Sequence, residues 1–178
     1  MKNIKRIAII GNSGSGKSTL AKQLHKIYNL PVYHLDQYFW KPNWVQPNPD
    51  EYKIIHDQLC DLDKWIIDGV NLRIMEYRIQ RADVIIFLDF PRYLCFYRIF
   101  KRFFKYYGKE TPSSPKGCVE KLSWALIPFL KYVWNFKNKY PQKIKHLLKQ
   151  YANTKEIYIL KSQKEIDEML EKIKKTAL

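Results

Sequence analysis

A segment near the start of the chain combines glycines, a lysine and a serine at a spacing that binds phosphate. Gly11, Gly16, Lys17 and Ser18 occupy the fixed positions of the pattern G-x-x-x-x-G-K-[ST], after a short apolar run and before a helical one. In such a loop, successive backbone N–H groups point at phosphate oxygens, and the lysine adds a positive charge. We therefore predict an ATP site made by Gly11, Asn12, Ser13, Gly14, Ser15, Gly16, Lys17, Ser18 and Thr19.

A phosphate site of this kind needs Mg²⁺, because the ion bridges the β- and γ-phosphates and offsets the charge that develops during transfer. Ser18 would supply a hydroxyl ligand. Asp68 ends an apolar run and precedes Gly69, and we predict it as a direct or water-mediated Mg²⁺ partner. The alternative is a turn-forming Asp-Gly pair. We expect Gly69 to let a ligand approach closely.

The residues after the second apolar run favour transfer to a bound acceptor over hydrolysis. The sequence has no guanine-reading N-K-x-D pattern and no paired acid of the D-E type that ATPases use to activate water. Asp36 could orient or deprotonate an acceptor hydroxyl, and Phe39 and Trp40 could stack on a planar substrate. The alternative for Asp36 is a helix cap beside a hydrophobic cluster. We expect His34 to pack or to form a hydrogen bond rather than to catalyse.

Two arginines share one face of a helix that we predict over Tyr93–Lys105. Arg98 and Arg102 lie four residues apart, so both can point at the same phosphates. Guanidinium groups suit this task because their planar donors bind phosphate oxygens in pairs and can also stack on a base. The alternative is a basic helical face in water. The residues that we predict to be catalytic are Lys17, Asp36, Arg98 and Arg102.

Short apolar runs alternate with helical stretches, which predicts a parallel sheet covered by helices on both faces. The expected strands are residues 5–10, 31–35, 65–67, 84–88 and 157–160. Their carboxyl ends should gather active residues at one edge, namely Asp36, Asp68 and Asp89. Between Pro91 and Tyr151 we expect several helices and a mobile lid, with Leu122–Phe136 as a buried helical segment. We expect a single domain over residues 1–178.

The composition is that of a folded and strongly basic protein. Hydrophobic residues make up 46% and charged residues 28%, which argues against disorder. The 32 Lys and Arg against 17 Asp and Glu give a net charge of +15, which predicts attraction to a polyanion. The three cysteines lack metal-site spacing, so we expect reduced thiols and no zinc. We also expect no signal peptide, no membrane span, a cytoplasmic location and a monomer or homodimer.

Seven segments together resemble the P-loop nucleotide kinases of the adenylate kinase type, and more closely the bacterial DNA topology modulation proteins (FlaR-like). They are GNSGSGKSTLA, VYHLDQYFWKPNW, WIIDGVN, RADVIIFLDFPRYLCFYRIFKR, GCVEKL, FKNKYPQKI and IYILKSQKEID. The resemblance implies a three-layer P-loop NTPase fold, with a five-stranded parallel sheet of order 2-3-1-4-5. It also implies a helical lid after the fourth strand, at about residues 101–120.

The same resemblance implies roles for single residues. Arg98 would stack on the adenine and Arg102 would bind phosphates, while the loop after the last strand would border the base with Lys161, Ser162 and Gln163. The acceptor side would be formed by Asp36, Phe39, Trp40, Gly69, Asn71 and Arg73. The segment from Asp68 to Asn71 differs from the D-G-F-P-R sequence of adenylate kinases, which argues against AMP as the acceptor.

Two functional hypotheses follow from these features. The first is a small-molecule kinase that uses ATP and Mg²⁺ and phosphorylates a nucleoside, a nucleotide or another aromatic compound. The second is a nucleotide-dependent DNA-binding protein that affects DNA topology, supported by the charge and by the basic aromatic stretch Arg98–Tyr107. The first hypothesis is favoured, because ATP already accounts for the arginines of that stretch. Association of Phe96–Tyr107 with a membrane surface is a weaker third possibility.

Overall fold

The computed structural model describes residues 4–111, 114–121, 124 and 126–177. Its strands are β1 (Arg6–Gly11), β2 (Val32–His34), β3 (Trp65–Asp68), β4 (Val84–Leu88) and β5 (Glu156–Leu160). Its helices are α1 (Lys17–Tyr28), α2 (Leu35–Phe39), the short 3₁₀ helix η1 (Pro42–Trp44), α3 (Pro49–Asp61), α4 (Met75–Arg81), α5 (Arg92–Lys105), α6 (Leu126–Lys139), α7 (Pro141–Gln150) and α8 (Gln163–Ala177).

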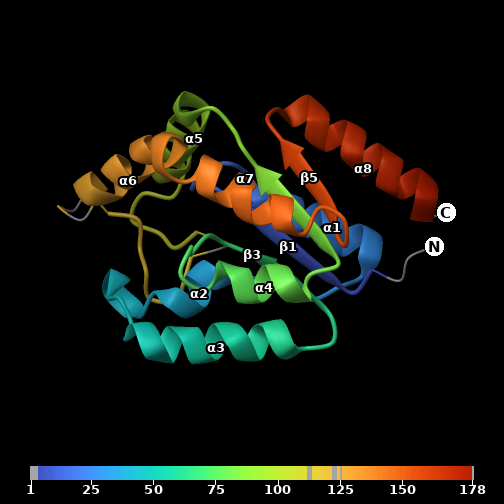
Figure 1. Ribbon diagram of the computed structural model, residues 1–178. Coiled ribbons are helices and arrows are strands. Elements are labelled where there is room, and N and C mark those ends of the chain that lie inside the picture. The colour runs from blue at the N-terminus through green and yellow to red at the C-terminus, as the bar shows by residue number, and fades with distance from the viewer. Residues whose placement is uncertain (1–3, 112–113, 122–123, 125, 178) are drawn as a thin grey trace.

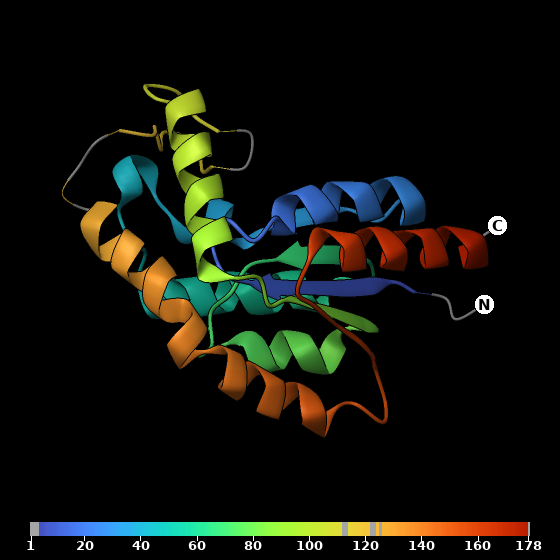
Figure 2. The same ribbon diagram turned by 90° about the horizontal axis from the view of Figure 1, so that it is seen from above.

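The five strands form one parallel sheet in the order β2-β3-β1-β4-β5, which confirms the predicted topology. The register sets the last residues of neighbouring strands side by side. Asp68 pairs with Ile9 on one side and with His34 on the other, and Gly11 pairs with Leu88. The carboxyl ends therefore share one edge of the sheet, and α2, α5 and α6 lie beyond that edge, opposite the two termini (Figure 1; Figure 2).

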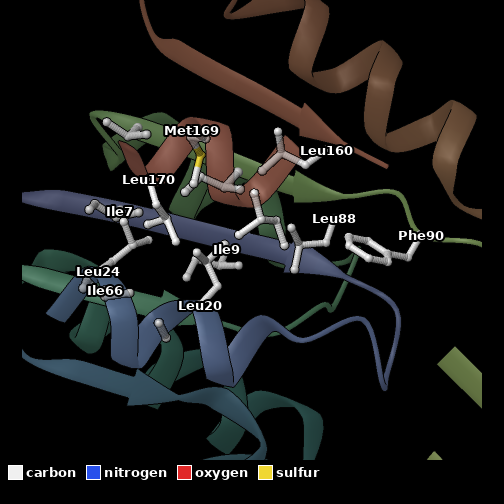
Figure 3. Close-up of a cluster of buried hydrophobic side chains, with 14 of the residues drawn as sticks. Ile7, Ile9, Leu20, Leu24, Ile66, Leu88, Phe90, Leu160, Met169 and Leu170 are labelled. Carbon is white, nitrogen blue, oxygen red and sulfur yellow. The ribbon is translucent and has the colours of Figure 1, made fainter. Parts of the chain in front are cut away.

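Alternate side chains of the central strand β1 enter two separate cores. Ile7 and Ile9 pack with the apolar faces of α1 and α8, where Leu20 and Leu24 point at the sheet (Figure 3). Ala8 and Ile10 pack on the other side, with residues from α3, α4 and α7. The sheet is buried on both faces, as expected when helices connect parallel strands. The fold therefore has the three predicted layers.

The interval between β4 and β5 contains the expected helices, but the burial predicted for Leu122–Phe136 is wrong. Within α6 only Val133 and Phe136 are buried, and Trp134 is 47% exposed. The helix runs along α5 and α7 at the margin of the sheet, so one stripe of it meets the core and its other apolar residues reach the surface. The first part of the predicted segment, residues 122–123 and 125, lies outside the described residues.

The predicted lid begins with the last residues of α5. After Lys105 the described chain forms turns, and an isolated parallel bridge joins Tyr107 to Glu120. Residues 112–113 of this segment are outside the described part. Among the residues that the structure describes, no helix is long and apolar enough to cross a membrane.

Candidate nucleotide and acceptor site

The phosphate loop joins β1 to α1 and packs closely against α5. Gly14 has a φ of +76°, and an added Cβ would lie 2.4 Å from the carbonyl oxygen of Cys95. Gly16 has a φ of +99° and directly precedes the first residue of α1. Both positions need glycine, one for space as well as conformation. The loop therefore has the backbone form that a run of inward N–H groups requires.

Lys17 provides the positive charge at the centre of the site. Its ammonium donates to the carbonyl oxygen of Asn12 at 2.9 Å, within the loop itself. Burial lowers the pKa of Lys17, and the nearby carboxylates of Asp36 and Asp68 act in the opposite direction. A lysine with one carbonyl partner retains free N–H groups, so it can bind phosphate oxygens as well.

The Asn12 side chain has a role that sequence analysis did not assign. Its amide donates to the carbonyl oxygen of Val133 at 2.8 Å and thus connects the loop to α6. Asn12 is therefore a structural anchor, in addition to any contact of its backbone with phosphate. The hydroxyl of Ser15 and the Oδ1 atom of Asn12 are buried without a partner among the described residues. Such polar atoms are costly unless a water or a ligand supplies a hydrogen bond.

Asp68 lies at the end of β3, beside the loop. It is buried, and its Oδ1 atom is 2.9 Å from Nδ1 of His34, which confirms the hydrogen-bonding role expected for that histidine. Its Oδ2 atom has no partner in the described part of the chain. An oxygen in this state can accept a hydrogen bond from metal-bound water or ligate the ion directly.

The residues predicted for Mg²⁺ fit that ion and not a preformed protein cage. No group of three or more His, Cys, Asp or Glu that could hold a metal exists among the described residues. Mg²⁺ in phosphate-transfer sites commonly uses one or two protein ligands, together with phosphate oxygens and water. The Ser18 hydroxyl at the start of α1 and the unpartnered oxygen of Asp68 match that requirement.

Asp36 lies in the first turn of α2, within electrostatic reach of Lys17. Protein atoms crowd its carboxylate and raise its pKa, while the charge of Lys17 lowers it. The side chain is nevertheless exposed to solvent. Solvent access limits the effect of crowding, and a carboxylate in this position can accept a proton or a hydrogen bond from an acceptor.

Aromatic rings line the region that follows Asp36. The ring of Phe39 lies edge-on to those of Trp40 and Tyr52, with ring centres 4.9 Å and 4.8 Å apart. The ring centres of Trp40 and Trp44 are 5.8 Å apart. Phe39 and Trp40 are half-buried, so part of each ring can contact a ligand. This cluster includes Tyr52 and Trp44, which come from α3 and η1 and which sequence analysis did not single out.

The turn after β3 differs from the prediction in one respect. The space that Gly69 leaves free is filled by Leu35, because an added Cβ would lie 2.8 Å from Cβ of that residue. The lack of a side chain at Gly69 thus lets α2 pack closely against this turn, and the free space is not open to a ligand. Asn71 accepts a hydrogen bond from the backbone of Arg73 at 3.1 Å, and the Arg73 side chain is exposed.

The two arginines of α5 both face the α1 side, at different distances from the loop. Arg98 donates to the carbonyl oxygen of Ser15 at 3.1 Å, lies 5.1 Å from the ring centre of Phe90, and contacts Gln163 at 3.5 Å. Arg102 forms an ion pair with Glu120 at 3.3 Å, so it connects α5 to the predicted lid segment.

A cavity of about 310 Å³ lies between α1 and the α5–lid segment. Three cations and several hydroxyl or amide groups line it, and no acid is among the lining residues: Ser18, Thr19, Lys22, Gln23, Lys26, Arg102, Tyr106 and Thr111. The cavity adjoins the end of the phosphate loop. Its charge suits an anionic ligand.

The loop after β5 is shaped by the start of α8. Ser162 and Glu165 cap this helix: the Ser162 hydroxyl accepts from the backbone N–H of Glu165 at 3.2 Å, and the Glu165 carboxylate accepts from the backbone of Lys161, the residue before the cap, at 2.8 Å. This S-x-x-E capping box is visible in the sequence, where it was not recognised. It fixes the side chain of Ser162 and places Gln163 beside Arg98.

Asp89, at the end of β4, is used for structure. Its buried carboxylate pairs with Lys137 of α6 and, at 2.7 Å, with Lys145 of α7. These two lysines were not predicted, because nothing in the local sequence links them to Asp89. The pairs hold α6 and α7 against the carboxyl edge of the sheet.

Sequence comparison finds limited similarity to known proteins. No family model matches the chain. An uncharacterized protein of Bacillus subtilis, YqaC, is 33% identical over 111 residues, which are 60% of this chain and 61% of that protein. The chain therefore matches about three fifths of the length of this curated relative. The resemblance to DNA topology modulation proteins stays a prediction.

Comparison with solved structures gives a clear result for the fold. A putative kinase from Chloroflexus aurantiacus superposes with a TM-score of 0.57 at 13% identity, over 99% of this chain and 100% of that chain. Shikimate kinase from Acinetobacter baumannii has a TM-score of 0.55 at 14% identity, over 96% and 90%. Deoxyadenosine kinase from M. mycoides has a TM-score of 0.53 at 17% identity, over 94% of this chain and 98% of that chain.

The chain has the fold of the P-loop kinases. At these identities the likeness concerns the fold alone, so the acceptor and the chemistry have to be inferred from this chain's own residues.

The contact between Gly14 and α5 generates a prediction with an internal control. Gly14→Ala and Gly108→Ala place a side chain at nearly the same φ, +76° and +74°, but only the first meets a neighbour within 4 Å. We expect Gly108→Ala to lower the free energy of unfolding by about 1 kcal/mol, and Gly14→Ala by about 2 kcal/mol more, since it also overpacks the interface. Urea titrations of both variants measure the difference. Equal losses would show that the loop does not depend on this close approach.

Proposed function

We propose that the protein is an ATP-dependent kinase that transfers the γ-phosphoryl group to a hydroxyl of a small-molecule acceptor. The observation that carries the proposal is the position of Lys17. Its ammonium lies in the phosphate loop within electrostatic reach of Asp36 and Asp68, with an arginine of α5 on the other side of the loop. These are the groups that phosphoryl transfer needs: cations for the phosphates, a metal partner and an acceptor base.

Each residue would have a separate task in this proposal. The loop amides and Lys17 bind the β- and γ-phosphates, while Arg98 and Arg102 hold the nucleotide from α5. Mg²⁺, held through Ser18 and Asp68, supplies charge neutralisation at the transferred group when it is bound. Asp36 orients the acceptor hydroxyl and accepts its proton, and the neighbouring aromatic cluster contacts the rest of the acceptor.

A second candidate function, binding of single-stranded nucleic acid, is supported by the outer face of α5. Exposed aromatic residues recur there every three or four positions, namely Tyr93 (69% exposed), Tyr97 (62%), Phe100 (38%) and Phe104 (75%), and Tyr107 (54%) follows just after the helix. Rings of this kind can stack on bases, and the basic charge of the chain would attract the backbone. This face is separate from Arg98, which contacts the phosphate loop, so the two functions can be tested independently.

Replacing Lys17 tests the phosphate site. Lys17→Ala should weaken binding of Mg·ATP at least tenfold, because a charge-assisted contact to phosphate contributes about 1.5–3 kcal/mol. The thermal midpoint should change little, since the side chain has one hydrogen bond inside the loop. Calorimetric titration with ATP measures the affinity. Lys149→Ala, which removes an exposed charge on α7, serves as the control. Equal affinities in Lys17→Ala and Lys149→Ala would refute the assignment of the loop.

Replacing Asp36 tests the acceptor side. Asp36→Asn should leave ATP affinity within about threefold of wild type and reduce acceptor-dependent ADP release about 100-fold, as loss of a general base does. The two numbers come from ATP titration and from a coupled ADP assay with a mixed panel of hydroxyl compounds. A similar loss in both would instead place Asp36 at the metal or in a structural role.

The double variant Arg98→Ala/Arg102→Ala separates the two candidate functions. If these arginines serve the nucleotide, ATP affinity should fall by about 1.5–3 kcal/mol per residue without any nucleic acid present. Affinity for single-stranded DNA should stay nearly unchanged. The opposite pattern, with intact ATP binding and a flatter salt dependence of DNA binding, would show that these arginines bind nucleic acid and would contradict their assignment to the nucleotide.

A further inference from the structure

Arg78 is a fully buried cation without a charged partner. It lies in α4, its side chain is 0% exposed, and its Nη2 atom donates to the carbonyl oxygen of Gly69 at 2.8 Å. Its Nε and Nη1 atoms have no partner within the described residues. None of the ion pairs of the described chain includes Arg78. One neutral carbonyl therefore satisfies only part of a five-donor group.

The contacts among the described residues leave the charge and most of the N–H donors of Arg78 unsatisfied. A guanidinium group stays charged in proteins, so burial cannot be relieved by loss of the proton. Burial lowers the pKa of Arg78, and Cys60, Tyr52 and the carboxylate of Asp68 act in the opposite direction. A buried charge that forms no ion pair is strongly destabilising. An oxyanion bound beside Arg78 would offset this cost.

The position of Arg78 identifies which ligand this would be. The carbonyl that it contacts belongs to the residue after Asp68, and Asp68 and Tyr52 lie within its electrostatic reach. Tyr52 in turn contacts Phe39 and feels the charge of Asp36. Arg78 thus lies behind the wall of the candidate acceptor site. Arg78 is on the opposite side of the sheet from the core formed by α1 and α8, and it belongs to a different helix from the arginines of α5.

We propose that Arg78 binds a carboxylate or phosphate group of the acceptor, so that the acceptor is an anionic hydroxyl compound. The inference rests on the proposed kinase function for the identity of the ligand. An unpartnered N–H of Arg78 would donate to the oxyanion, and the aromatic cluster would contact the remainder of the molecule. Because Arg78 is fully buried, the acceptor reaches it only when the neighbouring part of α3, with Tyr52, shifts outward.

The competing arrangement is a purely structural one. The unpartnered Oδ2 atom of Asp68 and the free N–H groups of Arg78 could be joined by a buried water. Arg78 would then brace the turn after β3 and bind no acceptor. The two arrangements differ in one measurable respect, because only the first makes stabilisation by an anion, beside a filled phosphate loop, depend on Arg78.

Inorganic phosphate can probe this second anion site. Wild-type protein is first saturated with Mg²⁺ and a non-hydrolysable ATP analogue, so that the loop is occupied. Thermal unfolding is then followed with increasing sodium phosphate and, as reference, sodium chloride at equal ionic strength. Phosphate should raise the unfolding midpoint by a few degrees above chloride, since a ligand that binds the folded state stabilises it. Arg78→Met should lose most of this difference.

Two further variants keep the test decisive. Arg81→Met removes a cation one turn along the same helix, where it pairs with Asp61 at the surface, and should retain the phosphate effect. Arg78→Lys keeps the charge and should retain part of the phosphate effect. This variant covers the case in which Arg78→Met does not fold. An equal phosphate effect in wild type and the Arg78 variants, or none in wild type, would overturn the proposal. The measurement needs no turnover, so it is independent of whether kinase activity is found.

Discussion

The close contact between the phosphate loop and α5 is the constraint on which the rest of the site depends. Gly14 approaches the carbonyl of Cys95 so closely that no side chain fits between them. That contact fixes the direction of α5 and sets Arg98 above the start of α1, where it holds the carbonyl of Ser15. A helix displaced by the volume of one methyl group would move both arginines away from the loop. The loop and the helix therefore form one rigid unit.

Long-range polar contacts complete this unit at the carboxyl edge of the sheet. Asn12 connects the loop to α6, and Asp89 connects the end of β4 to Lys137 and Lys145. The parallel register also fixes the position of Asp68, which pairs with Ile9 of β1 and His34 of β2. The result is a site in which the charged groups are held by the sheet and by its flanking helices, with the proposed acceptor side on α2 and α3. Preorganised charge is the main means by which kinases accelerate transfer.

Much of this arrangement was predictable because the relevant patterns are local. The P-loop sequence, the Ile-rich runs and the apolar spacing of α1 each report on their own neighbourhood, so the parallel strands and the helix predicted over Tyr93–Lys105 are confirmed. The resemblance to known kinases supplied the strand order. The cap formed by Ser162 and Glu165 was equally local but was not recognised.

The remaining features depend on contacts between distant parts of the chain. Nothing in the sequence near Arg78 shows that α3 and β3 bury it, and Asp89 meets its two lysines 48 and 56 positions later. The exposure of α6 could not be inferred from its composition, since hydrophobicity does not reveal which neighbours are available. Gly69 was expected to face a ligand for the same reason: the position of Leu35 is set by the tertiary fold.

ADP release from Mg·ATP, measured with and without a panel of nucleosides, nucleotides, sugars and hydroxy acids, tests the central claim most directly. The account predicts slow release with ATP alone and a large increase with one class of acceptor, accompanied by formation of the phosphorylated compound. Rapid ATP hydrolysis that no acceptor changes, or release that only DNA stimulates, would contradict it.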